Sequence, residues 1–513
     1  MLAIVNSVVL VGLEGQSVRV EVDISNGLPL CDIVGLPDAS VKESRERVRA
    51  AIKNSGFDFP LRRIIVNLAP GDIKKEGSIY DLPIALGIIL ASAEEPLEEP
   101  GEAVYAIGEL SLEGSLRPIP GVLPMALALQ EIEPGAIFIV PAANANEAAL
   151  ATRLKVLAAE NLSQVVKHWR GEEKLPTVRA GDSTAQPTAV AAVDLADIKG
   201  QVVAKRGLEI AAAGGHNILL IGSPGSGKTM LARSMPSILP PLTYEEALTV
   251  TKIYSAAGLL APGQGLMTER PFRTPHHTAS AASIIGGGRV PKPGEVSLAC
   301  HGVLFLDEIA EYRRDVLEAL RQPLEDRVVT VSRVAASLTY PASFILIGSM
   351  NPCPCGYYGD PLKECQCTPH QIMQYRKRLS GPLLDRIDLH LEVPRLTYSE
   401  VETGAGADSS AVVRERVQDA RRRQLDRLAA TGVTCNAAMN ARQVRQYCRL
   451  NAPARNLMRN AFSKMGLSMR AHDRILRVAR TIADLEGADI IDASHIAEAI
   501  QYRSLDWEER KEG

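Results

Sequence analysis

The chain lacks any run of about 18 uncharged apolar residues, the minimum that a membrane-spanning helix needs. Its first residues, MLAIVNSVVLVGLEGQ, lack the basic flank and the small-residue cleavage site of a signal peptide. Both absences favour a soluble cytoplasmic protein without a membrane partner. A formal net charge of -3 gives no overall attraction to nucleic acid, so any surface that binds a polyanion has to be local.

The composition is that of an ordinary globular protein, with 46% apolar and 23% charged residues, and this excludes a largely disordered protein. A length of 513 residues exceeds what one hydrophobic core usually serves and predicts about three domains. Four of the eight cysteines crowd into one short segment. In a cytosolic protein such clustering favours metal or redox chemistry over disulfides.

The order of apolar patterns predicts an α/β multidomain protein with a helical end. Residues 1–168 alternate strand patterns (17–22, 64–68, 136–140) with helical ones (41–54, 81–93). Residues 169–190 gain Pro, Gly, Ser and Thr, as a linker does. Residues 191–394 form a second α/β pattern, and residues 395–513 have helical periodicity at 410–430, 441–448, 454–464, 471–485 and 493–502.

The segment ILLIGSPGSGKTMLA matches a phosphate loop between a buried strand at 217–221 and the start of a helix. Its glycines let backbone N–H groups surround phosphates, the lysine neutralises β and γ oxygens, and the threonine reaches magnesium. The alternative is a glycine-rich turn without a ligand. The residues predicted to bind nucleotide are Gly222, Ser223, Pro224, Gly225, Ser226, Gly227, Lys228, Thr229 and Met230.

Further along, VLFLDE predicts a buried parallel strand that ends in two carboxylates. Asp307 is expected to hold magnesium, and Glu308 to orient and deprotonate the attacking water, although paired acids also occur in solvated turns. Asn351 follows a third apolar strand and suits a polar contact to the γ-phosphate, or a turn before proline. Arg386 is either an arginine finger or the partner of Asp385 or Asp388 in a salt bridge.

The order of the phosphate loop, VLFLDE, MNPCPCG, LLDRID and SMRAHDRILRVARTIADL resembles the magnesium-chelatase-like branch of AAA+ ATPases, and most closely the YifB/ComM family. The resemblance covers nearly the whole chain. It implies that Asn351 is sensor 1, that Arg386 acts in trans as the arginine finger, and that Arg470, rather than Arg474, is the sensor 2 arginine. An arginine acting in trans also implies a closed hexameric ring.

Three segments are candidates for contact with a substrate. The resemblance assigns RPFRTPHHTASAASIIGGGRVPKPGEVSL to an insert that points into the ring pore; a subunit contact is the alternative. The alternation in 327–340 predicts a hairpin with Arg333 near its tip. Between 414 and 480, sixteen basic residues face four acidic ones, which either solvate the helices or bind phosphates. In the insert, Arg270, Arg273, His276, His277 and Arg289 are the candidates for phosphate contact.

The cysteine cluster consists of Cys353, Cys355, Cys365 and Cys367, spaced as CPC, nine residues and CQC. Four thiolates can hold structural zinc in a tetrahedron, with His370 as a spare ligand, and reduced thiols without metal are the alternative. The insert at 353–367 is expected to protrude as a small loop.

The first domain resembles the second-domain fold of ribosomal protein S5 as it occurs in Lon-type proteases, on VNLAPGDIKKEGSIYDLPIALGIILA and AIGELSLEGSLRPIPGVLPMALAL. Lon chemistry needs a serine activated by a lysine. Ser78 stands in GSIYD instead of a Gly-Pro-Ser-Ala-Gly turn, and Met125 stands where the lysine is needed. We therefore expect a noncatalytic assembly or DNA-guiding domain.

The leading hypothesis is an ATP-driven hexamer that moves DNA, using ATP and Mg²⁺. What the family resemblance implies is a branch-migration helicase on single-stranded and branched DNA, which helps strands integrate by recombination in natural transformation. A protein-remodelling or metal-chelatase motor is the alternative, against which stand the fused Lon-like domain and the absence of an integrin-like domain. An ATP-dependent protease is disfavoured by Met125.

Overall fold

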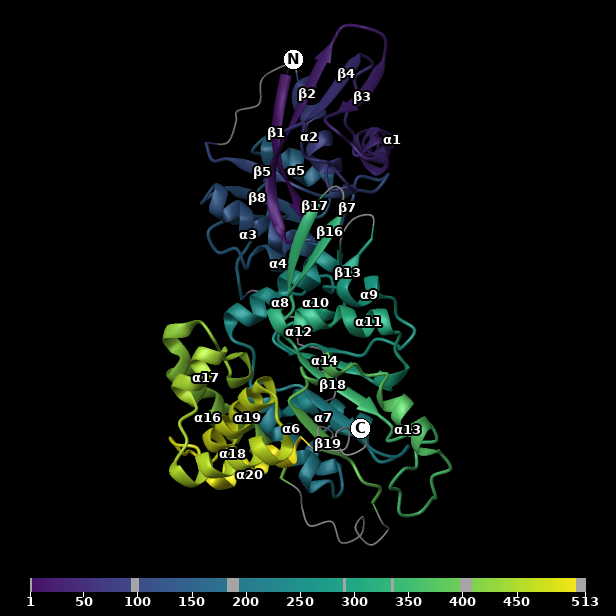
Figure 1. The fold of residues 1–513 in the computed structure, drawn as a ribbon. Helices are drawn as coiled ribbons and strands as arrows, with labels where there is room; N and C mark the ends of the chain where they lie inside the picture. Colours follow the sequence, from purple (N-terminus) through teal and green to yellow (C-terminus); the bar gives the residue numbers. More distant parts are fainter. Residues whose placement is uncertain are drawn as a thin grey trace. The chain divides into compact units, whose positions relative to one another are not determined.

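A computed structural model describes residues 2–93, 101–181, 193–288, 292–333, 336–396 and 408–503. They form two compact units, each traced in Figure 1. The first unit contains Met1–Pro187 together with Tyr244–Thr268, and the second contains Thr188–Thr243 together with Glu269–Gly513. The chain therefore passes between the units three times.

An eight-stranded sheet runs through the first unit in the order β10-β9-β8-β5-β1-β2-β4-β3. Alternation fixes which side of a strand is buried: in β2, Val18, Val20 and Val22 face the core. The strands are β1 (Leu2–Val11), β2 (Glu14–Ser25), β3 (Leu30–Val34), β4 (Arg63–Ala69), β5 (Val104–Ala106), β8 (Ile137–Pro141), β9 (Lys155–Ala159) and β10 (Thr177–Val178). A small hairpin joins β6 (Glu109–Leu110) and β7 (Leu116–Arg117).

The helices of the first unit are α1 (Ala39–Asn54), α2 (Asp81–Ser92), α3 (Val122–Ile132), α4 (Ala145–Ala148), α5 (Leu162–Trp169) and α8 (Tyr244–Ala257). Helix α2 is buried on nearly every side because it is apolar around its whole circumference. It packs on β1 and β2, and α3 packs on β2.

The expected linker at 169–190 begins too early for this structure. Thr177 and Val178 form β10 and pair with Leu157 and Val156 of β9, so they belong to the sheet of the first unit. Two residues are too short for a period-2 pattern to be visible in the sequence, which explains the difference. The rest of the expected linker, from 182, lies outside the described residues.

A parallel five-stranded sheet is the centre of the second unit, in the order β12-β15-β18-β11-β19. Its three inner strands are buried along their length, as both faces are covered by helices. The strands are β11 (Ile218–Ile221), β12 (Phe272–Arg273), β15 (Val303–Leu306), β18 (Ile345–Met350) and β19 (Leu389–Glu392), and among the helices are α6 (Val202–Gly214) and α7 (Lys228–Ile238).

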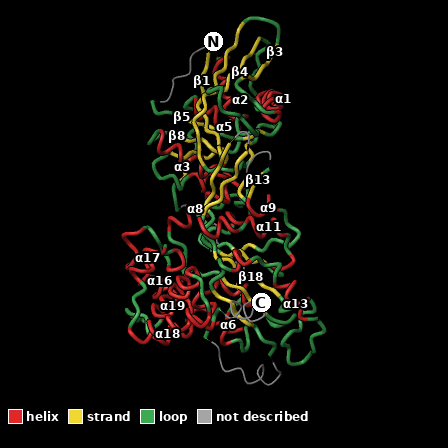
Figure 2. Tube along the Cα trace, in the orientation of Figure 1, coloured by secondary structure: helices red, strands yellow, loops and turns green. Residues whose placement is uncertain are grey.

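The last part of the second unit consists of helices that share one core with this sheet. Figure 2 shows them as a cluster of red tubes, and α16 and α19 pack on α6. Polar caps start them: Asn440, Asn451, Ser468 and Asp492 each accept a backbone N–H in the first turn. They are α16 (Ser410–Leu428), α17 (Ala441–Tyr447), α18 (Ala452–Met465), α19 (Met469–Leu485) and α20 (Ala493–Gln501).

Shorter elements connect the strands of the second unit. An antiparallel hairpin of β16 (Val328–Arg333) and β17 (Ala336–Pro341) precedes β18, as the alternation predicts. The remaining pieces are α9 (Ala281–Ile285), β13 (Gly286–Gly287), β14 (Lys292–Pro293), α10 (Glu295–Leu298), α11 (Arg314–Ala319), α12 (Arg321–Asp326), α13 (Pro369–Arg376) and α14 (Gly381–Leu384). Across the described ranges, no helix combines the length and apolarity needed to cross a membrane.

Candidate functional site

The glycine-rich loop predicted to bind phosphate connects the C-terminal end of β11 to the N-terminus of α7. Gly225 and Gly227 have φ of +79° and +95°, which only glycine adopts without strain. A Cβ atom at Gly222 would lie 2.2 Å from the carbonyl oxygen of Val393. The loop can therefore follow this path only with glycine at all three positions.

Lys228 lies at the centre of this loop. Its ammonium group donates to the carbonyl oxygens of Gly222 at 2.7 Å and Ser223 at 2.9 Å, and to the amide oxygen of Asn351 at 3.3 Å. Burial lowers the pKa of Lys228, while the nearby carboxylates of Asp307 and Glu308 oppose this effect. Asn351 directly follows β18, so the ends of two neighbouring strands meet at this ammonium group.

The two carboxylates that follow β15 lie at the same edge of the sheet. The Thr229 hydroxyl donates to Asp307 Oδ2 at 3.2 Å, and the Ser349 hydroxyl donates to the other oxygen of Asp307. Glu308 has φ of +51°, and its N–H donates to Ser349 Oγ at 3.1 Å. Thus four of the residues proposed from the sequence form two hydrogen-bonded pairs here, Lys228 with Asn351 and Thr229 with Asp307.

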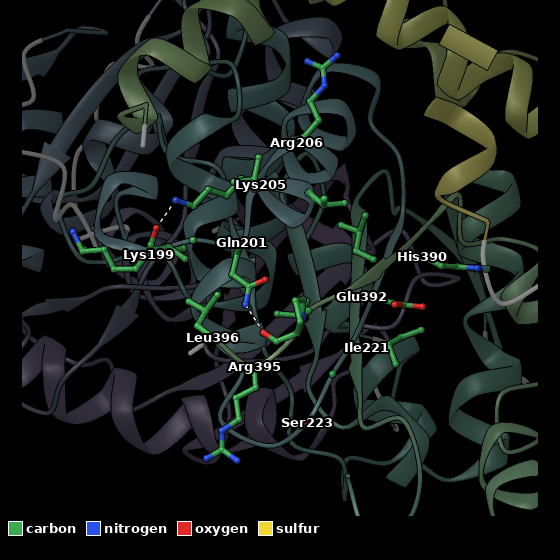
Figure 3. A pocket seen from close by; sticks show the side chains of 18 of the residues that line it. Lys199, Gln201, Lys205, Arg206, Ile221, Ser223, His390, Glu392, Arg395 and Leu396 are labelled. Carbon is green, nitrogen blue, oxygen red and sulfur yellow. Dashed lines mark hydrogen bonds between the residues drawn. The ribbon is translucent and has the colours of Figure 1, made fainter. Parts of the chain in front are cut away.

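A cavity of about 1330 Å³ opens beside this loop. Figure 3 shows Gln201, Ile221 and Leu396 on its walls, with the Gln201 amide donating to the Pro394 carbonyl at 2.7 Å. Sequence reasoning missed these residues. The available signal was the segment DIKGQVV, which leads into the first turn of α6 and supplies Ile198, Lys199, Gly200, Gln201, Val202 and Val203 to the lining.

Arg386 follows α14, and its ion-pair partner differs from the two that the sequence suggested. It pairs with Glu325, not with Asp385 or Asp388, and donates to the Pro382 carbonyl at 2.7 Å. The Arg386 side chain is 14% exposed to solvent. Among the polar contacts of the described residues, none joins Arg386 to Lys228 or Asp307, so the structure does not bring it into the loop of its own subunit.

The arginines of α19 are divided by exposure. Arg470 is exposed in the first turn, and no hydrogen bond or ion pair to it occurs among the described residues. Arg474 is largely buried and lies 3.8 Å from Asp388, the residue that precedes β19. Because β19 and β11 are parallel, Asp388 lies at the opposite edge of the sheet from the phosphate loop.

The four clustered cysteines converge, although their spacing alone left this open. Their sulfur atoms lie within 4.8 Å of one another, and three of the separations are 3.3, 3.7 and 3.6 Å. A zinc ion with bonds of about 2.3 Å requires sulfur atoms about 3.8 Å apart, so the set fits tetrahedral coordination. A hydrogen bond from the Tyr357 N–H lowers the pKa of Cys355 to about 6, which favours the thiolate that a metal needs.

Two arginines in the insert expected to meet phosphates are engaged within the second unit. Arg270 donates to the carbonyl oxygens of Pro240, Pro241 and His301, and Arg273 forms a double hydrogen bond with Glu295. In this structure the guanidinium groups of both arginines therefore bond to neighbouring groups of the same unit. The rings of His276 and His277 lie against each other, tilted by 34° with centroids 4.1 Å apart. Arg289 lies outside the described residues, as does the tip of the hairpin after Arg333.

The basic excess of the C-terminal helices includes arginines that are ion-paired within the unit and others that are exposed. Arg416, Arg427 and Arg480 form ion pairs within the unit, with Glu209 or Asp484. Between 414 and 480, only three acidic residues, Glu415, Asp419 and Asp426, are exposed. The exposed basic residues of this range are Arg414, Arg422, Arg423, Arg442, Arg445, Arg449, Arg455, Arg459, Lys464 and Arg470.

In the first unit, the position that would need a proteolytic lysine is filled by Met125, which is 1% exposed in the core. The Ser78 hydroxyl donates to the carboxylate of Glu109 and not to an amine. A serine activated by a lysine is therefore not formed by these residues.

Comparison with known proteins shows the family of this chain. Three family models match in order: subunit ChlI of magnesium chelatase (residues 20–144), magnesium chelatase subunit ChlI (194–401) and the ChlI C-terminal region (407–503). The chain is 46% identical to the YifB protein of Salmonella typhimurium over 98% of this chain and 97% of that one. This chain belongs to the YifB/ComM family of magnesium-chelatase-like proteins.

Two further relatives mark the breadth of this family. Competence protein ComM of Haemophilus influenzae is 44% identical over 98% of both chains. The 38 kDa subunit of magnesium chelatase from Rhodobacter capsulatus is 24% identical over 54% of this chain and 77% of its own. The magnesium-chelatase-like AAA+ family to which these matches belong implies ATP and Mg²⁺.

The residues of the phosphate loop fit such a ligand. Ser226 Oγ is buried in the loop and has no hydrogen-bond partner among the described residues, as a hydroxyl that faces a phosphate would. The backbone N–H groups of the glycine-rich loop and the Lys228 ammonium group supply the remaining hydrogen-bond donors. The Thr229 hydroxyl and Asp307 are the oxygen ligands that Mg²⁺ prefers.

Proposed function

We propose that this protein is an ATP-hydrolysing motor whose nucleotide lies between the phosphate loop and the carboxylates after β15. The observation that carries the proposal is a pair of hydrogen bonds at this loop, one from Lys228 to Asn351 and one from Thr229 to Asp307. These groups come from the ends of β15 and β18 and from α7, and they meet where a parallel sheet binds its ligand.

Each residue has a role in this proposal. Lys228 neutralises the β and γ oxygens, and Thr229 and Asp307 hold Mg²⁺, which supplies charge stabilisation when bound. Glu308 orients a water molecule and accepts its proton while the bond from the γ-phosphorus to the bridging oxygen breaks, which gives ADP and phosphate. Asn351 holds the γ-phosphate.

The assembly that we propose is a homohexameric ring. Arg386 completes the site of a neighbouring subunit, and exchanges its Glu325 partner for the nucleotide. Arg470 is exposed at the start of α19 and is available to a neighbour, so we retain it as the sensor 2 residue. Heterologous contacts of this kind close into a ring.

DNA is the substrate that the exposed charges favour. The basic excess on the C-terminal helices suits phosphate contact, since arginine binds phosphate through a planar fork. A relative carries the name competence protein ComM. We infer branch migration of single-stranded and branched DNA during recombination in natural transformation, in the cytoplasm.

Two parts of the chain support this motor without reacting. The first unit is a noncatalytic domain of the S5 or Lon type for assembly or DNA guidance, since Met125 replaces the lysine. The cysteine cluster holds structural zinc.

The test compares ATPase rates of the full chain with single-stranded DNA, branched DNA and an unfolded protein, each at two salt concentrations. DNA stimulation that weakens with salt is the expected result, because phosphate contacts release counterions. The distant similarity to a magnesium chelatase subunit favours a protein-directed motor as the second candidate. Stimulation by unfolded protein alone would establish that candidate and overturn the DNA proposal.

A further inference from the structure

The cysteine cluster lies against the phosphate loop. Gly356, the residue after Cys355, has φ of +87°, and a Cβ atom there would lie 2.8 Å from Pro224 Cδ and 2.9 Å from its Cγ. Pro224 is the third residue of the loop predicted to hold phosphate, which begins at Gly222. The segment that carries the four thiols thus packs against the Pro224 ring of the phosphate loop.

The same segment forms a wall of the cavity beside the loop. Pro352, Tyr358, Gly359, Asp360 and Pro361 line this cavity together with Gly222 and Ser223. The Tyr358 N–H donates to Cys353 Sγ at 3.3 Å, so the position of this wall residue depends on a metal-ligating sulfur. Arg376 of α13 lies over the Tyr358 ring, 5.5 Å from its centroid.

The two ends of the cysteine segment lead to the phosphate loop and to the turn after β15. Asn351 precedes Cys353 by two positions and contacts Lys228. Thr368, next to Cys367, caps α13, and Arg378 beyond this helix bonds to Glu311, three residues after Glu308. A segment without regular structure needs a crosslink to keep one conformation, and four thiolates on one ion would supply it.

We propose that a soft divalent cation, of which Zn²⁺ is the example, binds Cys353, Cys355, Cys365 and Cys367 and fixes the cavity wall, so that nucleotide affinity depends on metal occupancy. This inference rests on the proposed nucleotide site. Coupling between two sites is reciprocal, so bound nucleotide retains the metal by the same factor by which the metal tightens the nucleotide.

The first experiment measures this reciprocity with the full chain. Zinc content is determined in the purified protein, and release of Zn²⁺ to an excess of chelator is followed with and without ADP. At least about tenfold slower release with saturating ADP is expected for wild type, and no protection for Lys228→Ala. Failure of the wild-type protein to hold Zn²⁺, or release at one rate with and without ADP while ADP binds, would overturn the inference.

The second experiment separates the contact from the metal. Gly356→Ala keeps all four thiols but drives the wall against Pro224, whereas Gly432→Ala, after α16 and away from the cavity lining, has similar backbone strain, φ of +69°, with no atom within 4 Å of its Cβ. Both variants are expected to keep zinc, and only Gly356→Ala to weaken ADP binding, by about tenfold. Equal ADP affinities of the two variants would contradict the contact.

A third comparison distinguishes this inference from the proposed function. Cys365→Ser should lose zinc and weaken ADP binding, while Cys31→Ser, at a partly exposed cysteine of the first unit, should change neither. If zinc-loaded wild type fails to bind ADP, the proposed nucleotide site itself is wrong. If it binds ADP through Lys228 and zinc removal leaves the affinity unchanged, only the coupling is wrong.

Discussion

At the residue scale, the site depends on one ammonium group that lies between backbone carbonyls and an amide. Replacing Lys228 with Ala removes the charge partner of the β and γ oxygens. Loss of a buried charge partner costs about 2–5 kcal/mol, so nucleotide affinity should fall by at least about thirtyfold. Titration with a fluorescent ADP analogue measures this. Affinity close to that of wild type would show that the loop does not hold the phosphates.

Glu308→Gln tests a different step from binding. The amide keeps the size of the side chain but cannot accept a proton from water, so hydrolysis should slow by about 10²–10⁴-fold with nucleotide binding retained. Single-turnover ATP hydrolysis beside the same ADP titration distinguishes the two steps. Turnover at the wild-type rate would remove Glu308 from the reaction.

Arg386→Ala should abolish ATPase activity in the assembled protein while the subunit still binds nucleotide, because the proposed target is the neighbour's site. Glu325→Gln is the matched control, since it breaks the same ion pair and leaves the guanidinium in place. ATPase rates and ADP titrations of both variants decide this. Loss of ADP binding by Arg386→Ala would instead indicate a local role.

At the element scale, a helix from the middle of the chain is built into the first unit. Glu147 lies buried and accepts from Ser255 of α8 at 2.6 Å and from Asn144 at 2.6 Å. The Gly263 N–H donates to the Ala143 carbonyl at 2.8 Å. The range 191–394 proposed for one ATPase core therefore contains a segment, Tyr244–Thr268, that packs elsewhere.

Burial raises the pKa of Glu147 above its usual 4.5, and hydrogen bonds from Ser255, Asn144 and Leu123 oppose this effect. A carboxyl group whose pKa is higher in the folded than in the unfolded state stabilises the folded state at pH values below its unfolded pKa. This contribution is lost as the pH rises through the folded pKa. The unfolding free energy of the first unit should therefore fall, relative to Glu147→Gln, as pH rises above about 4.5.

The measurement uses urea unfolding followed by Trp169 fluorescence, in a Trp507→Phe background, because the chain has two tryptophans. Wild type and Glu147→Gln are compared from pH 4 upward, as a difference that cancels the other carboxyls. A difference that stays constant with pH would contradict the assignment.

Periodicity predicted the elements well where an element is long. The helices expected at 410–430 and 471–485 are observed as α16 and α19, and the strand at 17–22 lies within β2. The two-residue β10 and the placement of α8 could not be predicted, because both depend on tertiary contacts that have no local pattern.

At the scale of the whole molecule, the order of motifs along the chain indicated the residues of the site better than it indicated the residues that pack around them. Lys228, Thr229, Asp307 and Asn351 meet because parallel strands end at one edge of the sheet, which the order of motifs implies. The cavity wall around Gln201 and the contact of Gly356 with Pro224 could not be predicted, since neither follows from a motif. Arg270 is the opposite case. Its charge and its place in a loop suggested phosphate contact, and in the structure it donates to carbonyl groups.

We expect one magnesium-bound triphosphate to lie between Lys228 and Asp307, at the phosphate loop. An experimental structure of Glu308→Gln with ATP and Mg²⁺ tests it directly. The account predicts triphosphate density within hydrogen-bond distance of the Lys228 ammonium, with Mg²⁺ beside Thr229 and Asp307. Nucleotide at another place, or a lysine and an aspartate too far apart to share one triphosphate, would contradict it.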